Sequence, residues 1–355
     1  MISGKYWPIH LKPQDDETIS SWIARVATGH GLEIRTFCKL ELPGAGLFKT
    51  DIDLSASKEL ARVLAEKTGT SLDRVLTTRV GEYEGKLYLK PTNGMTPKWI
   101  LPIGTYTRGA GIRTVGSPFC VACLAEDARP YFRRAWRLAF NTLCPLHGRL
   151  LSECCSVCKQ PIDLWKSAAP LAGGLGGFTV GRCPHCGAAL GVRPTARHLS
   201  GGKSAAAQQR FQAFLNETVT RGWVSIPGYG ATYSPLYFAG LHCMVDLFTQ
   251  HPCSRRLRQV LAAQAEHTYL RTVIHRLDGA FENLSVRSRH ALLRLLRGLL
   301  ADWPRRYIAF CQENQVPASA LYPDPKTVPY WYWYTTYLWL YRPARLTTSP
   351  RAANR

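Results

Sequence analysis

Apolar residues return at helical spacing in the first third of the chain. Residues 15–28 carry them at i, i+3, i+4 and i+7, namely Ile19, Trp22, Ile23 and Val26. This spacing predicts an amphipathic helix, which Asp15 or Asp16 could cap and which glycines would end. A second apolar set at residues 34–40 precedes a Pro/Gly turn at 43–46. The pattern predicts a small helical domain at the N-terminus.

Two further helices are predicted with a short glycine turn between them. One covers residues 57–68, the other carries Leu72, Val75 and Leu76, and Gly69-Thr70-Ser71 separates them. This order is typical of a helix-turn-helix, and also of any helical hairpin. As a DNA-binding motif, the second helix would end near Arg79. It would present four polar residues outward, namely Asp73, Arg74, Thr77 and Thr78.

The rest of the chain is less regular until the C-terminal part. Glycines and prolines interrupt residues 81–117, which predicts loop that could hold one hairpin. The clearest C-terminal helix covers residues 285–303 and stops at Pro304. Leucines cover one of its faces, and the other carries Arg287, His290, Arg294 and Arg297. Such a stripe is either the solvated face of a packed helix or a surface for an anionic partner.

Tyrosine and tryptophan dominate residues 330–341. This stretch is too short to span a bilayer. It could pack on the core or dock a partner, and core packing is the preferred prediction. The basic, polar tail 343–355 is predicted to be disordered.

The net charge of the chain indicates which class of partner it binds. The 355 residues include 45 Lys and Arg against 24 Asp and Glu, a formal net charge of +21. Such an excess favours a polyanionic partner such as DNA. The first residues lack an apolar signal core, and no apolar run reaches the roughly 18 residues of a membrane span. We therefore expect a cytoplasmic protein with no membrane partner.

Four short pairs of metal-ligand residues lie between Cys120 and Cys186, and we call each pair a knuckle. They are Cys120/Cys123, Cys144/His147, Cys155/Cys158 and Cys183/Cys186. Two ligands three positions apart on a tight turn can reach one tetrahedral metal, and two knuckles complete one site. Pairing first with second and third with fourth predicts two zinc ions. Because Cys154 precedes Cys155, the register of the third knuckle is open.

The number of ligand residues indicates that the metal ions are structural and not catalytic. Eight protein ligands fill eight positions, whereas a catalytic zinc keeps one position for water. A disulfide framework fits less well because the chain is long and its cysteines have metal-ligand spacing.

Basic and aromatic residues interleave between the first two knuckles. Arg133, Arg134 and Arg137 stand beside Tyr131 and Trp136. The arginines could bind phosphates or an acidic protein surface. Alternatively, the aromatic side chains pack the knuckles together while the arginines stay solvated.

Catalytic patterns are weak. The acidic cluster at 15–17 is explained as a helix start, and Gly201-Gly202-Lys203-Ser204 lacks the earlier glycine of a phosphate-binding loop. The chain is therefore not expected to be an enzyme. A nuclease or other metalloenzyme would need a carboxylate that the sequence does not nominate.

The order and distances of several motifs together resemble the TniQ family of transposition proteins. The motifs are QDDETISSWIAR at 14–25, FCVACLAED at 119–127, YFRRAWR at 131–137 and CPLHG at 144–148. The resemblance runs from about residue 8 to 190. The doubled Cys154-Cys155 and a glycine-rich insert at 173–177 depart from it.

The resemblance implies a target-selection adaptor without chemistry of its own. Relatives carry an N-terminal helix-turn-helix and two zinc motifs. They link a target-site recogniser to the AAA+ ATPase that recruits the transposase. In CRISPR-associated transposons the recogniser is an RNA-guided effector complex, on which TniQ can sit as a head-to-tail homodimer. The implied setting is the bacterial cytoplasm, at the nucleoid when bound. The rival hypothesis is a stand-alone zinc-dependent regulator that binds specific DNA sequences.

The expected fold is mainly α with small zinc-ribbon β elements. It divides into an N-terminal helix-turn-helix domain with linker (1–117), a double zinc-knuckle module (118–195), a basic helical domain (196–342) and the tail (343–355). The knuckle module is expected to act as the rigid joint between two binding surfaces.

Overall fold

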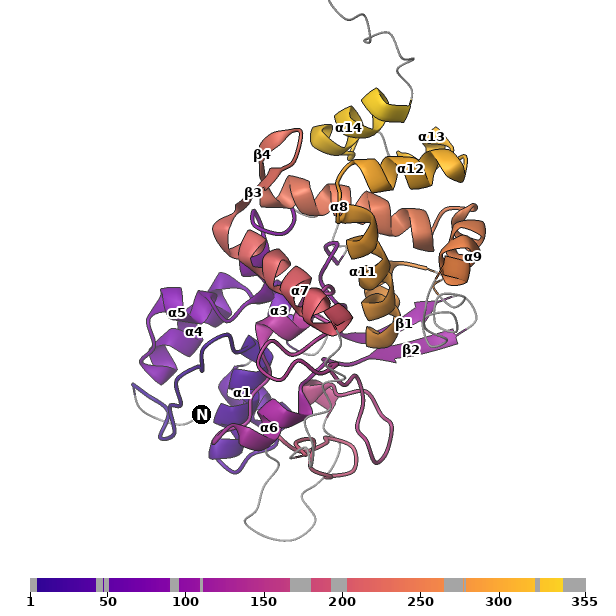
Figure 1. Ribbon diagram of the computed structural model, residues 1–355. Coiled ribbons are helices and arrows are strands. Elements are labelled where there is room, and N and C mark those ends of the chain that lie inside the picture. Colours follow the sequence, from indigo (N-terminus) through magenta and orange to yellow (C-terminus); the bar gives the residue numbers. More distant parts are fainter. Residues whose placement is uncertain are drawn as a thin grey trace, which may run out of the picture. The chain divides into compact units, whose positions relative to one another are not determined.

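The computed structural model describes residues 5–42, 47, 51–89, 96–108, 111–166, 180–192, 203–264, 277, 279–322 and 326–340 (Figure 1). Over this part the chain is mainly helical, with two antiparallel two-stranded sheets, as predicted at this level. The chain forms two compact units. The first comprises Met1–Glu84, Lys90–Leu215 and Glu282–His290, and the second comprises Gly85–Leu89, Asn216–Phe281 and Ala291–Arg355.

The first unit begins with short helices, drawn in indigo and purple in Figure 1. They are α1 (Ile19–Gly29), α2 (Ile34–Glu41), α3 (Ile52–Ser55), α4 (Lys58–Thr68) and α5 (Leu72–Leu76), followed by the 3-10 turn η1 (Val80–Tyr83). The helices predicted from periodicity are confirmed, and the first starts at residue 19 instead of 15. The predicted turn at 43–46 lies outside the described residues.

Hydroxyl side chains cap three of these helices. Thr18 accepts a hydrogen bond from Ser21 N, Ser57 from Leu60 N, and Ser71 from Arg74 N. The prediction that Asp15 or Asp16 caps α1 is therefore wrong. Gly69 ends α4 in the left-handed conformation (φ 62°), which glycine adopts without strain.

The acidic cluster before α1 makes tertiary contacts instead. Glu17 is buried and its carboxylate lies 2.5 Å from the guanidinium of Arg25. Asp16 accepts a hydrogen bond from Ala135 N at 3.1 Å, and Asp15 pairs with Arg74 at 2.5 Å. These carboxylates fix the entry of α1 against later segments of the unit.

One apolar core joins the N-terminal helices to the cysteine-rich region. Trp22 and Phe37 from the helices and Phe119, Phe132 and Trp136 from the knuckle region are all almost fully buried in the same cluster. Phe132 packs edge-on against Trp136 with ring centroids 5.9 Å apart. The predicted boundaries at 117 and 195 divide the chain more finely than the two units do, and they stay predictions.

The remaining elements of the first unit are small. Strands β1 (Gly104–Arg108) and β2 (Gly111–Val115) form the predicted hairpin. The chain continues into α6 (Val121–Glu126), η2 (Arg134–Arg137) and η3 (Leu164–Lys166). Gly116 lies against the backbone of Ile162, where a Cβ would come within 2.3 Å of Ile162 N. The region before the first knuckle can therefore pack on the chain after the third only because residue 116 lacks a side chain.

The second unit is built around α8 (Ser234–Thr249), which is buried along nearly its whole length. Helix α7 (Lys203–Arg221) leads from the first unit's residues into β3 (Trp223–Ile226) and β4 (Gly230–Tyr233), which pair as a hairpin. The other elements are α9 (Ser254–Gln264), α12 (Arg305–Glu313), α13 (Ala318–Leu321) and α14 (Tyr330–Leu340). The turn η4 (Phe281–Asn283) and the helix α11 (Val286–Leu300) are each divided between the units, because Glu282–His290 belong to the first. Helices α13 and α14 pack on α8, and α12 packs on α14 (Figure 1).

The predicted helix over 285–303 is α11, which ends at Leu300. Leu292 and Leu296 are fully buried, so the predicted leucine face is its packed face. The glycine-rich segments at 173–177 and 200–202 and the predicted tail at 343–355 lie outside the described residues.

Candidate metal centres

The first two knuckles bring four ligand side chains together, which we call the first cluster: Cys120, Cys123, Cys144 and His147. The ring nitrogen Nδ1 of His147 lies 3.5 Å from Sγ of Cys120 and 3.4 Å from Sγ of both Cys123 and Cys144. The Sγ atoms of Cys123 and Cys144 are 3.6 Å apart. Four donor atoms therefore face one point.

The third and fourth knuckles form the second cluster: Cys155, Cys158, Cys183 and Cys186. Sγ of Cys155 lies 3.7 Å from Sγ of Cys186, and Sγ of Cys158 lies 3.6 Å from Sγ of Cys183. The predicted pairing, first knuckle with second and third with fourth, is confirmed. Cys154 is exposed and stands outside the cluster, so Cys155 and not Cys154 belongs to the group that could hold a metal.

The donor spacing fits a tetrahedral ion of the size of zinc. Metal–sulfur bonds of about 2.3 Å and metal–nitrogen bonds of about 2.0 Å give a tetrahedron with S···S edges of about 3.8 Å and S···N edges of about 3.5 Å. The observed separations of 3.6–3.7 Å and 3.4–3.5 Å match these edges within about 0.2 Å. Two groups of four donors are thus in place to hold two metal ions.

Three knuckles share one backbone turn. In each, the amide of the first ligand donates to the carbonyl five residues on, as in Cys144 N to Arg149 O, and the carbonyl of the first ligand accepts from the residue after the second ligand. That last residue is left-handed every time: Gly148 (φ 63°), Lys159 (φ 59°) and Gly187 (φ 72°). Isolated bridges flank all three turns, for example Leu143 with Leu150. The predicted tight turns and small β elements are therefore present.

The first knuckle differs, because it lies on a helix. Cys120 is the residue before α6, and Cys123 sits in its first turn. Phe119 pairs with Ser152 through two hydrogen bonds of 2.8 and 2.9 Å, which holds this helix beside the chain that leads to the third knuckle. Gly191, after the fourth knuckle, lies so close to α6 that a Cβ would come within 2.6 Å of Ala125 N. The two clusters are thus packed through α6.

The cysteines within each cluster differ in pKa, and therefore in how readily each forms a thiolate. Hydrogen bonds from Cys123 and then Cys144 lower the pKa of Cys120 to about 2, and the hydrogen bond with Cys120 raises the pKa of Cys123 far above its usual value. In the second cluster, backbone amides overcome burial and lower the pKa of Cys155 to about 7, whereas burial raises the pKa of Cys183 to about 12. Metal binding must therefore displace protons from the neutral thiols and weaken as pH falls.

The arginines between the first two knuckles are occupied by protein partners. Arg137 is 0% exposed, donates to Asp53 at 2.8 Å and to Leu101 O at 2.8 Å, and also pairs with Asp51. Arg137 is therefore a structural arginine, in contrast to the predicted binding role. Arg133 makes a bidentate contact with Asp127 at 2.8 and 3.1 Å.

Only the aromatic half of the alternative fits this segment, because the three arginines are largely buried and not solvated as that alternative expected. The guanidinium of Arg133 lies over Tyr131 at 4.2 Å and over Trp136 at 4.9 Å. Arg134 is partly buried, with Nε 3.3 Å from a carboxylate oxygen of Asp16. Trp136 itself is buried in the shared core. A binding role for Arg133 or Arg134 stays a prediction.

The residues that the sequence suggested for DNA binding on and after α5 contact neighbouring residues of the same segment. Thr78 is only 2% exposed and its hydroxyl donates to Val75 O, so the prediction that it faces outward is wrong. The hydroxyl of Thr77 donates to Arg74 O at 2.8 Å. Arg79 pairs with Glu82 at 2.8 Å. Helices α4 and α5 and their glycine turn keep the predicted outline, and the helix-turn-helix function stays a prediction.

The basic face of α11 is mixed in character. Arg287 is exposed, Arg294 and Arg297 are partly exposed, and His290 Nδ1 lies 3.0 Å from the hydroxyl of Thr142. Arg289, which the pattern did not single out, is buried and donates to Ala139 O at 2.5 Å and to Leu284 O at 3.1 Å. A phosphate-binding role for Arg287, Arg294 and Arg297 stays a prediction.

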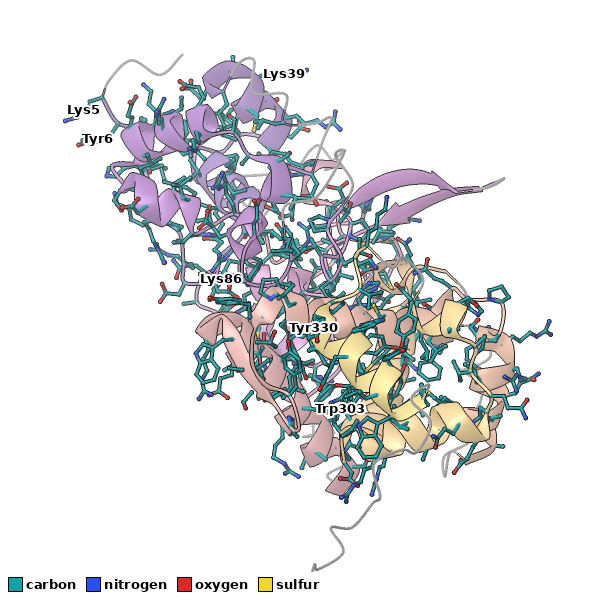
Figure 2. The ribbon with its side chains drawn as sticks, turned by 90° about the horizontal axis from the view of Figure 1, so that it is seen from above. Lys5, Tyr6, Lys39, Lys86, Trp303 and Tyr330 are labelled. Atoms are coloured by element: carbon teal, nitrogen blue, oxygen red, sulfur yellow. The ribbon has the colours of Figure 1, made fainter. Side chains whose placement is uncertain are left out.

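Helix α14 has one packed and one open face. Trp331 and Tyr332 are buried, which agrees with the predicted core packing. Tyr330, labelled in Figure 2, is 60% exposed, and Trp339 is 52% exposed. Trp333 stacks on Tyr337 with centroids 5.1 Å apart. The open face of α14 is the set Tyr330, Trp333, Tyr334 and Tyr337, which recur at i, i+3, i+4 and i+7 and are all at least 38% exposed.

Sequence reasoning missed one residue beside the first cluster. Glu126 ends α6 and places a carboxylate oxygen 3.0 Å from Nε2 of His147. Metal-bound histidines generally donate their second ring proton to such a group. The sequence offers one hint, because Glu126 follows the ligand residue Cys123 by three positions. No sequence pattern, however, connects Glu126 with His147.

Comparisons with known proteins give one positive result. No curated protein matches the chain. Among the described residues, no helix has both the length and the apolar character needed to cross a membrane. The TniQ family model matches residues 8–151, which include the first cluster and end before Cys155. This match, over less than half of the chain, supports a TniQ family transposition protein.

Proposed function

We propose that the protein is a non-enzymatic adaptor in DNA transposition, with structural zinc in both clusters. It links a target-site recognition complex to the AAA+ ATPase that recruits the transposase. Where the transposon is CRISPR-associated, the recognition complex is an RNA-guided effector with its guide RNA. DNA is the further partner, and the adaptor works as a monomer or a homodimer.

The observation that carries the proposal is a TniQ match that contains the first of two saturated clusters. Each cluster offers four protein donors at tetrahedral spacing, so a bound ion has no position left for a reacting water. Zinc suits donor sets of three or four thiolates, since soft sulfur ligands favour it over magnesium or calcium. The family match supports a role in transposition.

The chain's own residues explain what such metal would stabilise. The first cluster cross-links α6 to the second knuckle, and the second cluster cross-links two identical turns. Both lie on the same core as α1 and α2. Zinc supplies only the cross-links, and the shared core transmits their rigidity to the surface of the first unit.

Partner surfaces are available on the described residues. The open face of α14 consists of tyrosine and tryptophan, the residue types that dominate protein interfaces. We assign it to a protein partner. The net charge of +21 supports an additional contact with DNA or guide RNA.

A pull-down of the ATPase with target DNA and purified variants tests the proposed adaptor function. The variant C120S/C155S is expected to bind no more than traces of zinc and to lose ATPase recruitment in a pull-down with target DNA. The matched control C154S alters the exposed cysteine beside a ligand and is expected to keep two zinc ions and recruitment. A folded, zinc-free variant that still recruits the ATPase would overturn the proposal.

A gel-shift series separates the adaptor from the stand-alone regulator. The adaptor is expected to bind DNA weakly and without sequence preference alone, and tightly only with its partners. A regulator binds specific sequences on its own with steep salt dependence. The local engagement of Thr78 and Arg79 offers the regulator little support.

A further inference from the structure

The two ring nitrogens of His147 face different groups. Nδ1 points at the three sulfurs of the first cluster, at 3.4–3.5 Å from each. Nε2 points at a carboxylate oxygen of Glu126, 3.0 Å away. A neutral imidazole carries one proton, and only the nitrogen without it can bind a metal.

Glu126 is held where it can decide this arrangement. It is the last residue of α6, the helix that carries Cys123 and starts after Cys120. Asp127 N closes that helix by donating to Cys123 O at 2.8 Å, and the Asp127 carboxylate is clamped by Arg133. The backbone of Gly191 presses on the helix from another side. The carboxylate therefore extends from the last turn of a short helix, and two contacts hold that turn.

We infer that Glu126 is a positioning residue for the metal ion of the first cluster: it accepts the Nε2 proton of His147 and so presents the Nδ1 lone pair to the metal. The carboxylate keeps the ring in the orientation and tautomer that the cluster needs. It also makes the imidazole a stronger donor, because its negative charge polarises the N–H bond. The inference rests on the proposed occupancy of this cluster by zinc.

The second cluster contains no histidine, so it has no ring for a carboxylate to orient. Val157 N donates to Sγ of Cys155 and His185 N donates to Sγ of Cys183, each at 3.4 Å. These backbone donors stabilise thiolates directly and need no side chain. A change at Glu126 should therefore affect one of the two ions and leave the other in place.

Metal titration of the full-length protein tests the role. The probe is cobalt(II), whose visible absorption distinguishes a site with three sulfurs and one nitrogen from a site with four sulfurs, followed by competition with zinc. The variants are E126A, E126Q and the matched control E66A, which removes an exposed helical glutamate from α4 of the same unit.

The expected result is selective. E126A weakens metal binding at the three-sulfur site about tenfold and leaves the four-sulfur site unchanged. E126Q, whose side-chain carbonyl can still accept the Nε2 proton, weakens it about threefold because the charge is lost. E66A binds both ions as the wild type does. Circular dichroism at saturating zinc shows the same helix content for all four proteins.

Two outcomes would overturn the role. Equal affinity of E126A and the wild type at both sites means that Glu126 does not position His147. An equal loss at both sites means that the change merely loosens the fold. Neither outcome touches the proposed zinc occupancy, which fails separately if the wild-type protein binds fewer than two ions.

Discussion

Replacing Arg137 by methionine removes a buried positive charge and leaves its partners in place. The guanidinium has no exposed surface and contacts Asp53, Asp51 and Leu101 O. Two carboxylates then lose their counter-charge in a site that admits little water. Removing one partner of a buried ion pair costs about 3–5 kcal/mol, so we expect the first unit to lose that much stability.

The pH dependence of this loss has a defined sign. Burial, opposed by Arg137 and reinforced by Asp51, raises the pKa of Asp53 from 3.8 to about 6 in the folded protein. Without Arg137 the pKa rises further. The folded variant then binds a proton more tightly than the unfolded chain, so its stability increases as pH falls through the folded pKa. We expect a smaller penalty at pH 6 than at pH 8.

Urea unfolding followed by circular dichroism measures the penalty, with zinc present throughout. Hydrogen exchange in α1 and α3 assigns it to the first unit, since Ser20 N and its hydroxyl both donate to Asp53 at 2.9 Å. The control R133M removes a partly exposed arginine paired with Asp127 and should cost about 1–2 kcal/mol. The double variant R137M/D53N should recover at least about 1 kcal/mol.

The reasoning is refuted by a small or pH-independent effect. If R137M costs less than about 1 kcal/mol, the carboxylates find other partners or water, and the buried-pair argument does not apply. A penalty equal at pH 6 and pH 8 would show that Asp53 is not the group left uncompensated. Either outcome would reopen a surface role for Arg137.

Three further predictions use simple substitutions. C155S should lower the zinc content by one ion per chain in atomic absorption, whereas C154S should leave it unchanged. Loss of zinc in C154S would contradict the assignment of Cys155 as the ligand. In α14, W331A removes a buried ring that packs against Gly240 and should cost about 3–5 kcal/mol in urea unfolding. W333A should cost under about 1 kcal/mol yet weaken capture of the protein partner, and unchanged capture would remove the open face of α14 from the proposed interface. T18A should cost about 1 kcal/mol through loss of the α1 cap, whereas D15A should leave α1 intact in hydrogen exchange.

Local patterns predicted the parts of the molecule that depend on nearby residues. The spacing of Trp22 and Val26 gave α1, and the leucine spacing around Leu292 gave α11, because helix amphipathicity is visible within a few turns. Ligand spacing likewise predicted both clusters. Each knuckle is a local turn, and only the pairing of knuckles is long-range.

Two of the failures concern charged residues whose partners are distant in sequence. Arg137 looked like a surface arginine because nothing nearby reveals that Asp53, 84 residues earlier, will meet it in the core. Arg289 lies on the leucine side of α11 and was not singled out, since its acceptor Ala139 O is likewise distant in sequence. Periodicity says which face of a helix is apolar and does not say which cation will be buried with a partner.

The three identical turns around Cys144, Cys155 and Cys183 make the metal region modular. Because each closes with the same pair of backbone hydrogen bonds and the same left-handed residue, their sequences are interchangeable parts. Exchanging residues 155–160 with 183–188 should leave the backbone unchanged. A single change, His147→Cys, would give the first cluster the donor set of the second and shift its preference toward softer metals, without redesign of any surrounding element.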